Sequence, residues 1–189
     1  MTKYIRKLNK QGVWNKQKLT IEPDKILEQI PSDVFSKCMN STANTLSIWK
    51  VEGNNWDDFG DVIATIVSGS DGPNATDLVI LDDDLIRNIE LDKKPGKTPA
   101  SFEMNEMHYD ICNLTHYKIG VVAKYIGLKL AEDLEYEKQN QPKPSDSGVK
   151  RITESKLIVL MKNAIDKGCI NKSSLSTRWQ QKIEALKNK

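Results

Sequence analysis

The sequence predicts an α+β fold, a mixed β-sheet of about four or five strands packed by helices and followed by a C-terminal helical hairpin. Three patterns support this. Apolar and polar residues alternate from Asn44 to Glu52, as in a half-buried strand. Apolar residues recur every third or fourth position from Trp56 to Val67, as in an amphipathic helix. The continuous apolar run Leu78–Leu81 is typical of a central strand.

The N-terminal part is expected to form short elements. The basic piece around Tyr4 is expected to be an edge strand or an arm. Two short helices follow, one over Lys25–Gln29 and one around Val34, because Pro31 ends the first. The strand–helix–strand order over residues 44–81 makes the two strands parallel if they are neighbours.

The C-terminal part is expected to be mainly helical after two more strands. We expect a short strand over Ile86–Leu91 and another over Met107–Leu114. Thr115 is expected to cap a long helix that reaches about Tyr136, apolar on most sides and therefore well packed. Thr153 is expected to cap the next helix, and a final helix covers residues 175–186.

A change in composition suggests three parts. Residues 138–150 contain two prolines and few apolar side chains, which is typical of a flexible linker. The sequence therefore predicts an α+β main domain over residues 1–137, the linker, and a basic helical hairpin over residues 151–189.

Cysteine usage and hydropathy favour a cytoplasmic protein without a membrane span. Cys38, Cys112 and Cys169 are widely spaced and odd in number, which favours reduced thiols. No apolar segment follows the charged N-terminus, as a secretory signal requires. Charged residues interrupt the longest apolar stretch, Tyr117–Leu134, so we expect a buried helix rather than a membrane span.

Charge is segregated along the chain. Residues 1–18 contain six Lys or Arg and no acidic residue, and residues 150–189 contain ten basic and three acidic residues. Residues 19–149 contain 12 basic and 23 acidic residues. Basic ends suggest an anionic partner such as nucleic acid, while the simpler interpretation is that they pack on the acidic centre of the same or a neighbouring molecule.

The two C-terminal helices carry an apolar stripe and many basic residues. Their spacing partly matches a helix-turn-helix motif, but Leu175 stands one residue later than the motif requires. We favour docking or oligomerisation over DNA binding, because amphipathic stripes more often bury than bind. The expected contact residues are Leu157, Ile158, Trp179 and Ile183. The alternative nucleic-acid contacts are Lys3, Arg6, Lys7, Lys167, Lys172, Arg178 and Lys182.

Metal-ligand residue types occur in two places. Asp82, Asp83 and Asp84 follow a predicted buried strand, where carboxylates can hold Mg²⁺, and His108 is a further weak candidate. His108, Cys112 and His116 stand four residues apart, but the predicted strand-to-helix change points them in different directions. We therefore assign no metal and no cofactor.

The sequence also contains a fragment of a phosphate-binding loop. Pro95, Gly96, Lys97 and Thr98 match the end of that motif, but Leu91 stands where it requires glycine. A polar turn accounts for the same residues.

Three functions follow in order of preference. The first is a non-catalytic interaction or regulatory protein, which binds a protein partner or itself through exposed apolar residues; Trp49, Trp56 and Trp179 are candidates if they are accessible. The second is a nucleic-acid-binding accessory protein that uses both basic ends. The third is a metal-dependent hydrolase built on Asp82–Asp84 and His108. No residue is assigned a catalytic role.

Overall fold

The computed structural model describes the chain except for residues 1, 9–10, 40–43, 88, 145–146 and 188–189. The strands are β1 (Lys3–Leu8), β2 (Leu46–Val51), β3 (Thr76–Leu81), β4 (Leu91–Lys93), β5 (His108–Ile111) and β6 (Val149–Ile152). The α-helices are α1 (Ile26–Gln29), α2 (Asp33–Lys37), α3 (Gly60–Ser68), α4 (Asp83–Ile86), α5 (Phe102–Asn105), α6 (His116–Lys138), α7 (Glu154–Asp166) and α8 (Thr177–Lys187). Short 3-10 helices are η1 (Gln11–Trp14), η2 (Lys16–Lys18) and η3 (Lys172–Ser174).

The six strands form one sheet in the order β4-β5-β2-β1-β3-β6. Every pairing between the described strands is antiparallel. β2 and β3 run in the same direction but are not neighbours, because β1 lies between them and pairs with both. The α+β prediction is confirmed, with more strands than expected.

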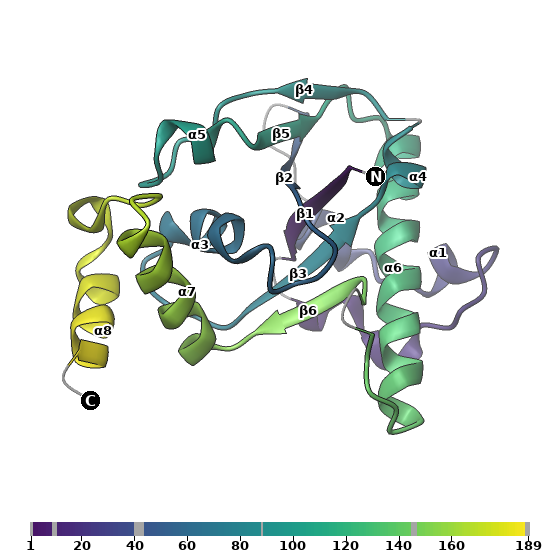
Figure 1. The fold of residues 1–189 in the computed structure, drawn as a ribbon. Helices are drawn as coiled ribbons and strands as arrows, with labels where there is room; N and C mark the ends of the chain where they lie inside the picture. Colours follow the sequence, from purple (N-terminus) through teal and green to yellow (C-terminus); the bar gives the residue numbers. More distant parts are fainter. Residues whose placement is uncertain (1, 9–10, 40–43, 88, 145–146, 188–189) are drawn as a thin grey trace.

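Helices cover both faces of the sheet, so the fold has three layers (Figure 1). Successive side chains of a strand point to opposite faces. Tyr4 and Leu8 of β1 therefore enter a first core with α6, whereas Ile5 enters a second core with α3, α7 and α8. All six residues of β3 are buried, as expected for a strand covered on both sides.

Side-chain caps define where the two long C-terminal helices begin. The Oγ1 atom of Thr115 accepts a hydrogen bond from the backbone N–H of Lys118. Thr153 caps α7 in the same way, through the N–H of Lys156. Both predicted caps are confirmed. Each hydroxyl accepts a hydrogen bond from a backbone N–H that has no partner within its own helix.

Two predicted elements differ from the structure, and one strand was not predicted. The basic N-terminal segment is a central strand rather than an edge or an arm, since Tyr4, Ile5 and Leu8 bury apolar side chains on both faces. The strand expected over Ile86–Leu91 is not formed: Ile86 ends α4, residues 87, 89 and 90 belong to no strand, and β4 begins only at Leu91. β6 was not expected. Its four residues pair with β3 and span residue 150, where the predicted linker ends and the predicted hairpin begins.

The C-terminal segment shares the core of the sheet. Leu157, Trp179 and Ile183 lie in the second core beside Ile80 of β3. α7 packs along α3, and α8 packs on α7. The helical hairpin is thus docked on one face of the sheet.

Candidate interaction groove

An apolar hollow of the described surface lies along the N-terminal half of α6. With about 100° of rotation per residue, Tyr117, Val121 and Leu128 fall within about 40° of one another on this helix. They face away from the residues that α6 buries in the first core, such as Ile126 and Leu130. We call this hollow the α4–α6 groove. Its volume is about 320 Å³, and it is lined by Leu85, Ile89, Tyr117, Lys118, Val121, Lys124, Tyr125 and Leu128.

Tyr117 stands at the open end of the groove. Its side chain is 79% exposed, the largest exposure among the exposed apolar and aromatic residues that the structure describes. Leu85 and Ile89 are buried and form the wall opposite Tyr117. The groove thus has a buried aliphatic wall and an exposed aromatic side chain. Apolar hollows with an exposed aromatic residue are common contact sites in proteins.

A partly buried hydrogen bond fixes the wall between α4 and α6. The hydroxyl of Tyr125 donates to Oδ2 of Asp82 at 2.5 Å. Burial, together with this carboxylate, raises the pKa of Tyr125 well above its usual value. Tyr125 is therefore a neutral phenol, which presents its ring to the groove and its hydroxyl to Asp82.

Lysines flank the groove on two sides. Lys118 lies on the α4 side, where its ammonium group donates to the carbonyl of Cys112 and stands 3.6 Å from Glu90. Lys124 lies on the other side of the stripe, about 120° around the helix from Lys118. The groove thus combines apolar walls with positive charge at its rims.

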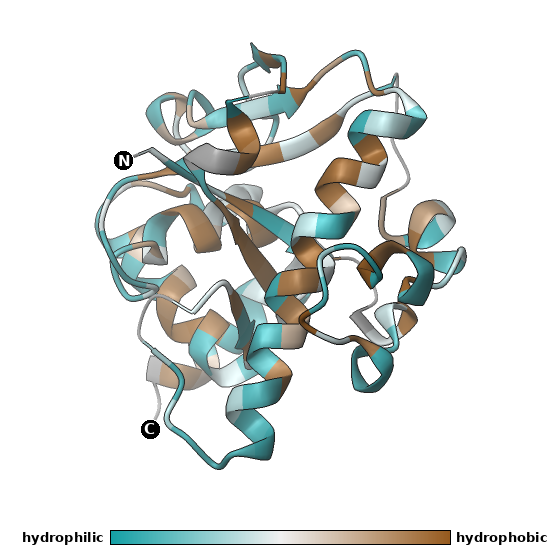
Figure 2. Ribbon diagram, turned by 90° about the vertical axis from the view of Figure 1, so that its right-hand side faces the viewer, coloured by the Kyte–Doolittle hydropathy of each residue, from teal (hydrophilic) through white to brown (hydrophobic). Residues whose placement is uncertain are grey.

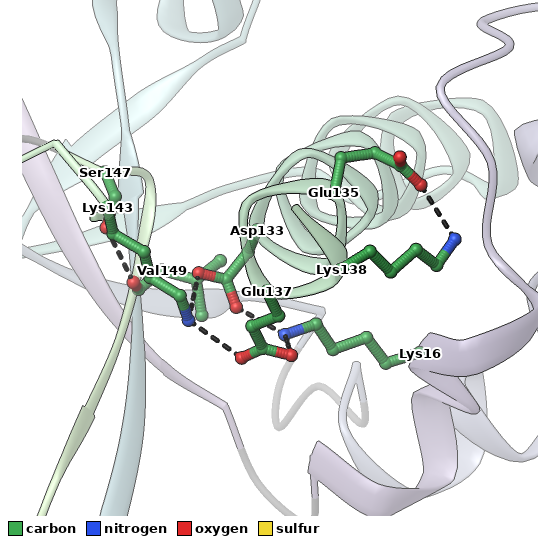
Figure 3. Close-up of polar contacts among 8 residues, drawn as sticks. All are labelled: Lys16, Asp133, Glu135, Glu137, Lys138, Lys143, Ser147 and Val149. Atoms are coloured by element: carbon green, nitrogen blue, oxygen red, sulfur yellow. Dashed lines mark hydrogen bonds and ion pairs between the residues drawn. The ribbon is translucent and has the colours of Figure 1, made fainter. Parts of the chain in front are cut away.

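A second polar feature of α6 is a network of four charged side chains (Figure 3). Asp133 and Glu137 lie one turn apart near the end of the helix. Lys16 of η2 pairs with both carboxylates, at 3.0 Å from Glu137. Lys143 also pairs with both, at 2.7 Å from Asp133 and 2.8 Å from Glu137. The two carboxylates are neutralised within the chain, and the network ties η2 and the segment after α6 to this helix.

Ion pairs join the basic ends to the acidic centre of the same chain. Besides the network of Lys16, three pairs link the C-terminal segment to earlier residues: Arg151 with Asp77, Lys156 with Asp57 and Lys167 with Asp61. The simpler interpretation of the charge segregation, in which the ends pack on the centre, accounts for these pairs.

The structure buries the apolar residues that were expected to contact a partner. Leu157, Ile158, Trp179 and Ile183 all lie in the second core. Trp49 and Trp56 are also buried there. These side chains are packed within the chain itself and offer no exposed contact surface.

The predicted nucleic-acid contacts are spread over the molecule. Arg6 is only 6% exposed and donates to the carbonyls of Ser47 and Cys38, and Lys7 is half-buried. Figure 1 shows β1 in the middle of the sheet and α8 at the left-hand edge of the molecule. The remaining cations differ in their contacts. Lys3 approaches the carbonyl of Asn54, and Arg178 is exposed beside Gly72. Three lysines form ion pairs: Lys167 with Asp61, Lys172 with Glu184 and Lys182 with Glu154.

The two metal candidates whose side chains the structure describes, Asp82 and His108, are not brought together. Residues paired across the sheet form a row from Ile80 of β3 through Ile5 and Trp49 to His108 of β5. His108 is therefore three strand spacings from Ile80, a distance of about 14 Å. Asp82 follows β3 and bonds Tyr125, while the side chains of Asp83 and Asp84 lie outside the described part. Among the described residues, no three His, Cys, Asp or Glu side chains gather as a metal site.

The residues spaced like zinc ligands serve separate local contacts. Nδ1 of His108 lies 2.7 Å from the carbonyl of Lys94, and the ring packs on Trp49. Cys112 is buried, and its thiol donates to the carbonyl of Asp110. His116 begins α6 and is exposed.

The phosphate-loop fragment is a turn held by Asn105. The N–H of Gly96 donates to the Asn105 carbonyl at 2.7 Å, and Oδ1 of Asn105 accepts from the N–H and the hydroxyl of Thr98. The side-chain amide also donates to the carbonyl of Ala100. The turn therefore directs its amides to its own asparagine, and the next helix, α5, begins only after Ser101.

Comparison with protein-family models, with curated proteins and with solved structures finds no match for this chain. None of the described helices is both long and apolar enough to cross a bilayer.

Sequence reasoning missed the α4–α6 groove because it treated the long helix as apolar on most sides and fully packed. A usable signal was present: Tyr117, Val121, Tyr125 and Leu128 repeat every third or fourth residue on a face separate from that of Val122, Ile126 and Leu130. Val121, Tyr125 and Leu128 pack only partly against the first core, which leaves part of this second stripe accessible.

Proposed function

We propose that this chain is a non-catalytic interaction protein that binds a partner protein in the α4–α6 groove. The partner segment is an α-helix that is apolar on one side and acidic along its edges. The observation that carries this proposal is the groove itself: apolar walls along α6, an exposed Tyr117, and Lys118 and Lys124 at its rims.

The shape of the groove supports a helical occupant. The lining residues of α6 run from Tyr117 to Leu128, which is about 17 Å of helix, or three turns. Amphipathic helices commonly bind in apolar grooves of this kind through residues spaced at i, i+3, i+4 and i+7. Crossing angles of about 20° allow two helices to stay in contact over such a length.

The polar groups at the groove favour binding rather than chemistry. The hydroxyl of Tyr125 is committed to Asp82, whereas Lys118 stands 3.6 Å from the exposed Glu90, a weak pair that an acidic partner can replace. The groove offers apolar area and positive potential, which give a binding site affinity and steer an acidic partner. The unpaired Cys38, Cys112 and Cys169 fit a reducing compartment, so we place this function in the cytoplasm.

A peptide titration tests the proposal. The probe is a fluorescein-labelled peptide of about three helical turns, with leucines on one face and glutamates at the edges, read by anisotropy. Wild-type protein is expected to bind it more tightly than a matched peptide with lysines in place of the glutamates. Tyr117→Ala is expected to weaken binding about tenfold, as for an aromatic contact residue, and Lys124→Glu is expected to weaken it as well.

The matched control is Phe102→Ala. Phe102 is 71% exposed on α5 and lies away from the groove, so its loss removes a similar aromatic surface elsewhere. Equal binding by wild type and Tyr117→Ala, or a larger effect of Phe102→Ala, would place the contact surface outside the groove.

A further inference from the structure

We infer that the open edge of β6 is a second interaction surface, which binds an extended segment of a partner protein with an acidic residue opposite Lys150. The segment pairs with β6 as an added antiparallel strand. This surface is separate from the α4–α6 groove, so the inference goes beyond the function proposed above. It follows from the hydrogen-bonding pattern of β6 and from the charge that this strand carries.

β6 is the last strand on one side of the sheet, and Figure 1 shows it at the lower edge of the fold. It pairs with β3 along one of its edges. Its other edge meets no strand among the described residues. Edge strands of this kind are common sites of strand addition, in which main-chain hydrogen bonds supply the affinity.

The register shows which backbone groups of β6 face the open edge. Residues of an antiparallel pair alternate between positions that exchange hydrogen bonds and positions that do not. The N–H of Ile80 in β3 donates to the carbonyl of Gly148 at 2.8 Å, so the alternation makes Lys150 the next bonded position. Val149 and Arg151 therefore direct their N–H and C=O groups outward.

Most of these outward groups are available to an added strand. The carbonyl of Val149 accepts a hydrogen bond from the hydroxyl of Ser147 at 3.0 Å. Within the part of the chain that the structure describes, no loop or cap hydrogen bond reaches the N–H of Val149 or the two backbone groups of Arg151. β6 thus offers two bonding positions, two residues apart.

Lys150 stands between the two open positions and selects the charge of the partner. Its side chain is exposed and takes part in no ion pair with another described residue. In an added antiparallel strand, the residue opposite Lys150 is at a non-bonded position, where the Cα atoms are about 4.5 Å apart and the side chains are close. An acidic residue there pairs with Lys150. The opposite edge strand, β4, differs, because its Lys93 already pairs with Glu106 at 2.6 Å.

The same charge argues against a second copy of this chain as the occupant. A two-fold antiparallel pair of β6 strands that uses both open positions places Val149 opposite Arg151 of the other copy. Lys150 then lies opposite itself, and like charges directly opposite one another destabilise a sheet. Lysine on an edge strand commonly prevents such self-pairing. The occupant is therefore a different, acidic chain.

The added strand also meets a hollow beside β6. The hollow has a volume of about 310 Å³ and is lined by residues 149–151 and the four charged side chains of the network in Figure 3. Partner residues opposite Val149 and Arg151 point to the same face as these two residues, which is the face of the first core. Figure 2 shows the end of α6 and the start of the segment that leads to β6 as hydrophilic. Polar side chains therefore suit these two partner positions.

NMR of the full chain with a short peptide tests the inference. The peptide has threonines around one central glutamate. Wild-type protein is expected to bind it with a Kd of about 0.1–1 mM, because few hydrogen bonds form. Binding is expected to slow hydrogen exchange of the Val149 and Arg151 amides. The amides of Lys150 and Ile152 already pair with β3 and are expected to change little.

Two methylated peptides test whether the main chain makes the contact. In the added strand, the N–H groups of the two threonines that flank the glutamate point to β6, and that of the glutamate points away. N-methylation of the two flanking threonines is therefore expected to abolish binding. N-methylation of the glutamate is expected to change the affinity by less than about threefold, since its N–H bonds no group of β6.

Charge exchange tests the role of Lys150. Lys150→Glu is expected to weaken binding of the glutamate peptide about fivefold and to favour a peptide with a central lysine, because attraction between opposite residues becomes repulsion. Lys150→Gln and Lys93→Gln remove the same charge from the two edge strands, and only the first is expected to weaken binding. Circular dichroism of each variant reports whether it is folded.

Three results would overturn the inference. They are no binding up to about 5 mM peptide, equal binding of the two methylated peptides, and an unchanged preference for glutamate in folded Lys150→Glu protein. None of them bears on the α4–α6 groove, which the helical peptide tests separately. Tyr117→Ala is expected to bind the threonine peptide like wild type, so the two proposals can fail independently.

Discussion

The hydroxyl of Tyr125 and Oδ2 of Asp82 are joined by a 2.5 Å hydrogen bond that links α6 to the segment between β3 and α4. The other carboxylate oxygen, Oδ1, is buried without a partner among the described residues. The Asp82 carboxylate therefore depends on Tyr125, and the same ring lines the α4–α6 groove. Stability and the shape of the candidate site are coupled at this pair.

Replacing Tyr125 with Phe is expected to lower the free energy of unfolding by about 1–3 kcal/mol, because the buried Asp82 carboxylate loses its donor. Urea denaturation followed by circular dichroism measures this. Tyr117→Phe is the control, since Tyr117 is exposed, and it is expected to unfold like wild type. An unchanged Tyr125→Phe midpoint would mean that Asp82 finds another donor.

Gly96 is expected to tolerate no larger side chain. A Cβ atom at this position would stand 2.6 Å from a ring carbon of Trp49 and 2.7 Å from Oδ1 of Asn105. Gly96→Ala is therefore expected to cost about 1–3 kcal/mol of stability through overpacking. Gly120→Ala, in α6 with nothing within 4 Å of the added atom, is expected to stabilise the protein by up to about 1 kcal/mol. Thermal unfolding of both variants would reveal opposite shifts of Tm.

The network around Glu137 predicts a pH dependence. The hydrogen bond from Lys143, and then that from Lys16, lower the pKa of Glu137. A carboxylate with a lowered folded-state pKa stabilises the fold above its ordinary value, about 4.3, and this contribution is lost as the pH falls through the folded-state value. Glu137→Gln is thus expected to be less stable than wild type at pH 7, by less than about 1 kcal/mol because the side chain is partly exposed.

Urea denaturation of wild type and Glu137→Gln between pH 7 and pH 3 measures the difference between their free energies of unfolding. This difference is expected to vanish at the lowest pH. Glu135→Gln serves as the comparison, because Glu135 contacts only Lys138 in the drawn cluster. A constant gap between wild type and Glu137→Gln at every pH would contradict the role given to the carboxylate charge.

The C-terminal segment is expected to be needed for folding of the rest. Trp179 is fully buried in the second core, and Trp179→Ala is expected to cost about 3–5 kcal/mol. A chain ending at residue 148 lacks β6, α7 and α8, so the second core keeps α3 but loses its other two long helices. Its urea unfolding is expected to lose cooperativity, whereas a sharp, wild-type-like transition would show that residues 1–148 fold alone. Leu186→Ala, at a partly exposed position, is the mild control.

The sequence predicted the elements whose signal is local. Each of these signals depends only on residues a few positions apart in the sequence. They are the alternation of apolar and polar residues in β2, the apolar run of β3, and the caps at Thr115 and Thr153. β1 was misplaced because its position depends on pairing with both β2 and β3, which lie far along the chain. β6 escaped notice because Lys150 and Arg151 make the middle of this four-residue strand polar, as is common for an edge strand.

The candidate site was harder to predict than the fold. The groove needs Leu85 and Ile89 to approach α6, a contact between segments far apart in the sequence that the Tyr125–Asp82 hydrogen bond also joins. The predicted interaction stripe of α8, in contrast, was a correct sign of amphipathicity. Periodicity shows that a face must be covered but does not show whether the chain itself or a partner covers it.

The most direct test of the central claim is methyl NMR of the full chain, recorded with increasing concentrations of the acidic helical peptide. The methyl groups of Leu85, Ile89, Val121 and Leu128 report on the groove, and those of Leu157 and Ile183 report on the second core. We predict shifts confined to the groove methyls. Shifts confined to the second core, or no shifts at any peptide concentration, would contradict an interaction site between α4 and α6.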